Sequence, residues 1–162
     1  MSKEQVISIR FDVEPQVRIR VISDDDTQEA KQGKIKYPFK LDNPVKVTVE
    51  TTFRTFSFVI YNGYCWNGAD IPKFFYRVIG SRTSNQFLIA SMLHDYLLEF
   101  KVFMLNEVLK NQITKDEYRR LTSLIFREKI KAQGTNTIKA NIMSWAVDVF
   151  QHYCNRKGWE IK

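Results

Sequence analysis

The sequence contains little of what marks a membrane, secreted or cysteine-rich protein. No apolar run reaches the roughly 18 residues that a transmembrane helix needs. The first residues, MSKEQVISIRFDV, lack the apolar core of a signal peptide, so we expect a cytoplasmic protein without membrane contact. The two cysteines, Cys65 and Cys154, lie far apart and form no CxxC pair, which argues against a cysteine-rich zinc site.

Motifs that would name an enzyme are also missing. The sequence has no Gly-x-Ser-x-Gly nucleophile motif and no phosphate-binding glycine loop. It has two histidines, His94 and His152, whereas metal phosphohydrolases with a His-Asp signature need further histidines and aspartates. The sequence therefore leaves open whether the protein is an enzyme at all.

Length and composition predict one globular domain. The chain has 162 residues, of which 44% are hydrophobic and 27% charged, and this is enough to bury a core. No repeat or low-complexity linker divides it. We expect a single domain over 1–162, with a β-rich part over 1–61 and a mainly helical part over 62–162.

Alternating apolar and polar residues predict strands in the first part of the chain. They cover 6–13, 17–22, 44–52 and 56–61, and Thr52 to Thr55 would form a hairpin turn. Asn62-Gly63 would end the last strand, and the chain would then enter a loop over 64–72, in which Asn67-Gly68 makes another turn. The first part should thus be an antiparallel sheet.

Helical periodicity takes over after Pro72. A short helix would end at Gly80, and Thr83 or Ser84 would cap a central helix that extends to about Phe100. A third helix should begin at the capping box Thr114-Lys-Asp-Glu117 and stop at Gly134. A fourth should span about 137–156, with these apolar residues at helical spacing: Ile138, Ile142, Trp145, Val149 and Tyr153. The predicted fold class is α+β, with an N-terminal antiparallel sheet, a helical C-terminal part and a buried central helix.

The central helix carries a polar pair that its apolar surroundings do not explain. Its sequence, SNQFLIASMLHDYLLE, is apolar on nearly every face, which is typical of a buried helix. His94 and Asp95 lie inside it, and titratable groups in a core are costly without partners. Either they form a structural polar network or they belong to a functional site.

The charge is uneven along the chain. The net charge is +7, of which residues 61–162 supply +6. The third helix carries several cations, among them Arg119, Arg120 and Arg127. These side chains predict either a solvated face, interleaved with carboxylates, or a nucleic-acid contact surface.

Two motifs in this order resemble a known family. WNGADIP (66–72) and LHDYLL (93–98) are similar to the phage and prophage family catalogued as domain of unknown function 1353. The resemblance covers about 60–100 closely. It implies a phage or prophage origin and a site around the loop and the His-Asp pair, and it implies no established reaction. The family's loop aspartate aligns with Asn67 and its serine with Asp70, and a further acidic position falls near Thr122 or Ser123.

The site hypothesis follows from these residues. His94, Asp95 and Asp70 offer an imidazole nitrogen and two carboxylates, which suit a divalent metal such as zinc. Alternatively, a carboxylate orients His94 as a general base. Further binding candidates are Asn67, Trp66 and Glu99. In the structural alternative, Asp70 caps the short helix and the His-Asp pair ties the loop to the central helix.

The leading hypothesis for function is a small phage- or prophage-encoded accessory or morphogenesis protein with this polar site. Its partners would then be other phage or virion proteins, and the virion is a second location beside the host cytoplasm. A metal-dependent hydrolase that uses the same site is one alternative. A basic nucleic-acid-binding protein, with contacts through the third helix, is the other. Substrate and oligomeric state are not determined by the sequence.

Overall fold

Three alternating valines build the central strand of the main sheet. In the computed structural model, which describes residues 3–19, 39–66 and 85–154, strand β4 spans Val45–Thr51. Its three valines are fully buried, and they pair with the alternating buried residues of strand β5, Thr55–Ile60. The opposed pairs are Val45 with Ile60, Val47 with Phe58 and Val49 with Phe56. The predicted face and hairpin are confirmed, with the turn at 52–54.

Strand β1, Val6–Phe11, completes the main sheet along the other edge of β4. The order is β1-β4-β5, and both pairings are antiparallel. The register shifts between Val6 and Ser8, which marks a bulge in the edge strand. The predicted strand over 6–13 is therefore confirmed but ends two residues earlier, where Asp12 turns to bind Lys46 of β4.

A second, smaller sheet was only partly predicted. It consists of β2 (Val17–Ile19), β3 (Phe39–Leu41) and β6 (Cys65–Trp66), in the order β2-β3-β6. Strand β6 replaces the start of the loop that the sequence predicted at 64–72, so that prediction was wrong for these residues. Strands of two or three residues are too short to show an alternating pattern, and backbone pairing with a distant segment defines them.

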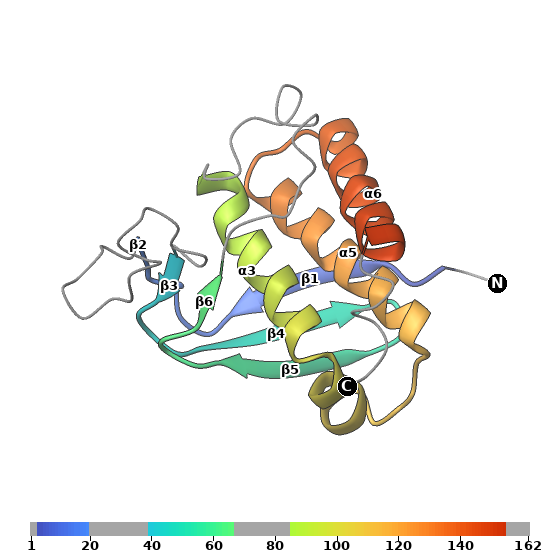
Figure 1. Ribbon diagram of the computed structural model, residues 1–162, viewed down its shortest axis with the longest axis horizontal. Helices are drawn as coiled ribbons and strands as arrows, with labels where there is room; N and C mark the ends of the chain where they lie inside the picture. The colour runs from blue at the N-terminus through green and yellow to red at the C-terminus, as the bar shows by residue number, and fades with distance from the viewer. Residues whose placement is uncertain (1–2, 20–38, 67–84, 155–162) are drawn as a thin grey trace.

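Helix α3, Asn85–Glu99, lies across the main sheet (Figure 1). Met92, Leu93, Tyr96 and Leu97 belong to the core that includes the sheet residues, while Phe87 and Ala90 join a second core with the later helices. The helix is thus buried on opposite sides, as the sequence predicted. The prediction that Phe100 continues the apolar row was wrong, because Phe100 leaves helical geometry and is 39% exposed.

A short irregular segment follows α3 and was not predicted. Helix α4, Lys101–Phe103, leads into a π-helical turn at Met104–Val108, labelled η2. Lys110 and Asn111 then adopt positive φ angles of 49° and 56° and reverse the chain. Met104 and Leu105 are buried, so this segment covers the end of the core beside β5.

Helix α5, Lys115–Ala132, begins with the predicted capping box. The Thr114 hydroxyl accepts a hydrogen bond from the Glu117 N–H, and the Glu117 carboxylate accepts one from the Thr114 N–H at 2.7 Å. The helix ends before Gly134, which has a φ of +94° that suits glycine. Both predicted ends are confirmed.

Helix α6, Thr137–Cys154, packs against α5 on the side away from the sheet (Figure 1). Its buried face consists of Ala140, Met143, Ala146 and Val147. The apolar stripe that the sequence placed at helical spacing does not form this face, because Ile138 and Trp145 are 73% and 61% exposed. Small residues let the helix approach α5 closely, and the large ones point outward.

The architecture is α+β, with N-terminal antiparallel sheets followed by helices, as predicted. None of the helices in the described ranges is long and apolar enough to cross a bilayer. Several predictions lie outside the described residues, namely the strand residues 20–22, the helix at 72–80, the caps Thr83 and Ser84, and the end of the fourth helix beyond Cys154.

The capping box predicts a measurable cost at Thr114. Thr114→Ala should lower the free energy of unfolding by about 1 kcal/mol, because the Glu117 N–H loses its acceptor. Urea denaturation measures this value. Thr114→Ser keeps the hydroxyl and should stay within a few tenths of a kcal/mol of wild type. An equal loss in both variants would contradict the capping role.

The same box predicts a pH dependence. Hydrogen bonds from the Thr114 backbone and hydroxyl lower the pKa of Glu117 below its ordinary value of 4.5. A depressed folded-state pKa adds stability above the unfolded-state pKa, and this stability is lost as the pH falls through the folded-state pKa. Glu117→Gln should therefore flatten the acid limb of stability against pH, measured by denaturation between about pH 2 and 6.

Candidate functional site

The predicted His-Asp pair lies on α3, and its two members face different surroundings. His94 is 5% exposed, and its ring meets the ring of Phe126 on α5 edge-on, with centroids 5.7 Å apart. Asp95 is one position along the helix, with a side chain 20% exposed. The pair therefore spans the boundary between the helix–helix core and a more open edge.

Geometry at the imidazole favours one tautomer. Nδ1 of His94 lies 3.7 Å from a carboxylate oxygen of Asp95, beyond hydrogen-bond distance but close enough for the charge to favour a proton on Nδ1. Nε2 is then a lone-pair acceptor. It is buried and has no hydrogen-bond partner among the described residues. A buried nitrogen without a hydrogen-bond partner lowers the stability of the folded protein. Nε2 is therefore the atom of α3 that a ligand would satisfy.

The open edge of α3 faces a tyrosine that no sequence motif singled out. Tyr64 precedes β6 and lies close to the carboxylates of Asp95 and Glu99. Burial and these two carboxylates raise the pKa of Tyr64 far above its ordinary value. Tyr64 therefore stays protonated. Its ring also meets Tyr96 edge-on, with centroids 5.2 Å apart.

Trp66 is a core residue of this region. It is 1% exposed and packs beside the rings of Phe39 and Tyr64, with centroid distances of 5.8 and 6.1 Å. Its indole N–H has no hydrogen-bond partner among the described residues. Trp66 therefore lies in the core and packs against the ring of Tyr64.

The structure joins only some of the predicted metal ligands. Asn67 and Asp70 lie outside the described residues. Within the described ranges, no three His, Cys, Asp or Glu side chains gather closely enough to hold one metal ion. His94 and Asp95 are neighbours on one helix and point in different directions, whereas Glu99 lies one turn beyond Asp95 on the same face. The structure thus places Asp95, Glu99, Tyr64 and Trp66 along the edge between α3 and β6, while His94 faces α5.

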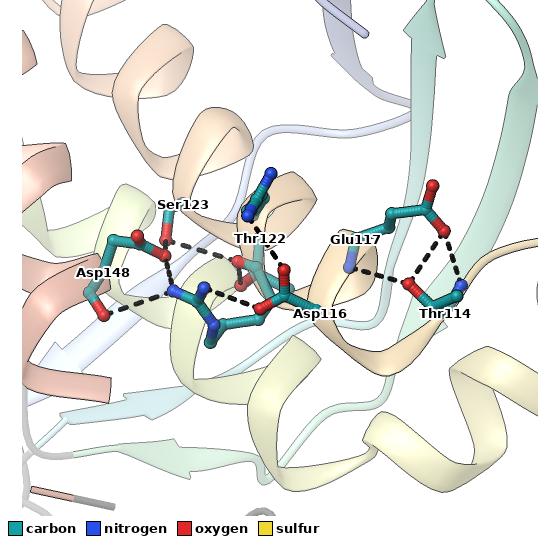
Figure 2. A network of polar contacts seen from close by, with 8 residues as sticks. Thr114, Asp116, Glu117, Thr122, Ser123 and Asp148 are labelled. Carbon is teal, nitrogen blue, oxygen red and sulfur yellow. Dashed lines mark hydrogen bonds and ion pairs between the residues drawn. The ribbon is translucent and has the colours of Figure 1, made fainter. Parts of the chain in front are cut away.

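Arg119, a predicted nucleic-acid contact, is instead buried in an ion-pair network. Its guanidinium binds the carboxylates of Asp116 on α5 and Asp148 on α6, two residues that Figure 2 shows in this polar network. Burial opposes its charge, but the two carboxylates outweigh that effect and raise the pKa of Arg119. The prediction of a solvated face is wrong at Arg119, because its side chain is only 9% exposed.

The same network occupies the position where the family's acidic residue was expected. The Ser123 hydroxyl donates a hydrogen bond to the Asp148 carboxylate at 3.3 Å, and the Ser144 hydroxyl donates to the Ser123 carbonyl at 2.9 Å. Asp148 therefore brings a carboxylate to this part of α5 from α6. The contact joins residues 25 positions apart, so only the packing of the two helices reveals it.

A groove with a volume of about 1040 Å³ lies on a different part of the surface from His94. It is bounded by the N-terminal segment, the β4–β5 hairpin, α5 and α6. The other two predicted nucleic-acid residues, Arg120 and Arg127, line it. So do three carboxylates: Glu4, Glu117 and Asp148.

Comparison with known proteins identifies the family of this chain. A family model described as a protein of unknown function, DUF1353, matches residues 39–147. The chain belongs to this family. The match spans β3, β4, β5, β6 and α3, and it continues through α5 into α6. The predicted family is therefore confirmed, and the DUF1353 region contains the His-Asp pair and Arg119.

One relative of this DUF1353 chain is y4jT of Sinorhizobium fredii (strain NBRC 101917 / NGR234), an uncharacterized protein. It is 31% identical over 103 residues, which cover 59% of this chain and 26% of the relative. The chain thus matches about a quarter of that protein's length. No solved structure matches the chain.

The Arg119 network predicts a stability effect. Arg119→Ala should lower the free energy of unfolding by about 2–4 kcal/mol, because it leaves Asp148 without its cation and cuts a link between α5 and α6. Arg120→Ala is the matched control, since Arg120 is 67% exposed and its pair with Asp116 should contribute about 0.5 kcal/mol or less. Equal effects in urea denaturation would contradict the structural role.

Proposed function

We propose that this protein is a small phage- or prophage-encoded accessory or morphogenesis protein that binds a divalent cation on α3 through His94. The observation that carries the binding site is the buried Nε2 of His94, which has no hydrogen-bond partner among the described residues. The phage or prophage role rests on the resemblance of WNGADIP and LHDYLL.

The chemistry of the imidazole fits a cation such as zinc. A ligating histidine usually directs its second nitrogen toward a carboxylate, and Nδ1 of His94 faces Asp95 in this way. Nε2 would supply the metal–nitrogen bond. The described residues offer no complete set of three ligands, so the site needs further oxygens, for which the sequence offers Asp70 and Asn67.

A metal-dependent hydrolase is the second candidate, and the orientation of His94 by Asp95 favours it. A bound cation would lower the pKa of a water molecule and thereby supply a nucleophile. In that case Asp95 would hold the imidazole in position, and the hydroxyl of Tyr64 would remain a proton donor at the edge of the site.

Metal analysis tests the proposed site. Wild type should retain about one zinc per chain after dialysis, and His94→Ala should lose it while circular dichroism stays unchanged. His152→Ala removes the other histidine and should retain the metal. Asp95→Asn should weaken zinc binding by about 10–100-fold, because it removes the charge behind the ligand.

Nitrogen-15 NMR of the imidazole supplies a second readout that does not depend on activity. Zinc should shift the Nε2 resonance of His94 and leave that of Nδ1 nearly unchanged. If no divalent cation moves the Nε2 resonance, and His94→Phe melts above wild type, the imidazole is only a packing group and the proposed site is wrong. Cleavage of a phosphodiester by the zinc-loaded protein, absent in His94→Ala, would select the hydrolase.

The accessory role needs a separate measurement, because a metal site by itself does not imply it. Tagged protein expressed during phage growth should co-purify with a defined virion component. Recovery of the protein from infected cells without any such component would contradict the morphogenesis role and leave the metal result unaffected.

A further inference from the structure

The outward face of α6 is apolar and uncovered. Ile138, Ile142 and Trp145 are spaced by four and three residues, so they lie on one side of the helix. They are 73%, 36% and 61% exposed. The opposite side of α6 supplies the residues buried against α5, so the helix has two apolar faces and only one of them is covered among the described residues.

This stripe continues into the groove through Trp145. Trp145, Asn141 and Ser144 line the groove from α6, and Leu121 and Leu124 line it from α5. Phe53, at the turn between β4 and β5, is 54% exposed and lines it from the sheet side. The surface formed by Ile138, Ile142 and the groove, called the α6 groove below, therefore has two exposed aromatic rings along one apolar path.

The α6 groove has a small excess of positive charge, because four cations and three carboxylates line it. Its carboxylates are engaged within the protein: Glu4 pairs with Arg54 at 2.8 Å, and Asp148 binds Arg119. Glu117 is held in the capping box of α5. The remaining cations are Lys3, Arg120 and Arg127.

The two arginines are available to a partner. Arg120 pairs with Asp116 at 3.0 Å and Arg127 with Glu128 at 2.8 Å, each within α5. Such pairs near the surface contribute little, so a partner's carboxylate can replace them at small cost. Arginine beside an exposed aromatic ring is also the composition typical of binding hot spots.

We propose that the α6 groove binds an acidic amphipathic helix of another protein. Its apolar residues would lie on Ile142, Trp145 and Phe53, and its carboxylates would meet Arg120, Arg127 and Lys3. This is the helix-in-groove mode of recognition, in which apolar anchors give affinity and charge gives specificity.

Two other occupants fit the surface less well. In a symmetric pair of this chain, the arginines of both copies would converge on the same contact, and like charges would repel. A nucleic-acid strand would leave the stripe without a use, because Ile138 and Ile142 cannot stack on bases. The acidic helix satisfies both the apolar stripe and the positive charge.

Peptide titration tests the proposal. The probe is a synthetic helix of about 18 residues with leucines at positions i, i+4, i+7 and i+11, glutamates beside them and alanines elsewhere. A peptide with lysine in place of glutamate and a scrambled acidic peptide are its controls. The indole N–H signal of Trp145, assigned with Trp145→Phe, should shift saturably with the acidic helix alone, and binding should weaken as salt rises.

Variants locate the site. Trp145→Ala and the double variant Arg120→Glu with Arg127→Glu should each weaken binding by about tenfold or more. Their matched controls are Ile19→Ala and Arg18→Glu on β2, which Figure 1 shows at the far end of the molecule from α6. These should leave the affinity unchanged, and circular dichroism checks the fold of every variant.

Four results would overturn the proposal. One is an unmoved Trp145 signal at about 1 mM acidic peptide, a concentration that reveals even weak binding. Another is equal affinity for the acidic and basic peptides. The third is tighter binding of a single-stranded oligonucleotide to the same surface. The last is a stable dimer in solution that Trp145→Glu converts to a monomer.

Discussion

Helix α3 is apolar on nearly every face, so other elements of the protein must cover nearly all of it. The rest of the fold depends on this requirement. The main sheet covers one side of it through Met92 and Tyr96, and α5 covers another through Phe126. Strand β6 comes to its edge with Tyr64 and Trp66. The order of the layers follows, because each element that contacts α3 contributes an apolar face that water would otherwise meet.

Polar groups inside this core differ in how completely the protein satisfies them. Arg119 is almost fully buried, yet its guanidinium has two carboxylates around it and forms a link between α5 and α6. Tyr118 donates its hydroxyl to the Leu97 carbonyl at 2.6 Å and so satisfies the end of α3. Nε2 of His94 has no such partner among the described residues. The indole N–H of Trp66 also lacks a partner, but only the imidazole nitrogen can ligate a metal, so His94 is the group that we assign to binding.

Much of the fold could be predicted because the apolar patterns of short segments agree with the burial of those residues in the folded protein. The valines of β4 alternate, and their buried side is the side that faces α3. The capping box at Thr114 works within one turn of chain, so the start of α5 needs no distant contact. In α6 the pattern misled, because Ala140 and Met143 pack closely on α5 and the larger Ile138 and Trp145 do not. Periodicity identifies an apolar face, but it does not say which of two faces a neighbour covers.

The sequence by itself determined the α+β class, the buried central helix, the ends of α5 and the family, because these depend on periodicity, capping and motifs that lie within short stretches. Tertiary structure alone decided that Arg119 is buried with Asp148, that β3 and β6 pair, and that Tyr64 lies close to Glu99. The physical reason is separation along the chain. Each of these contacts joins residues at least 25 positions apart, and their pairing depends on how the layers close around α3.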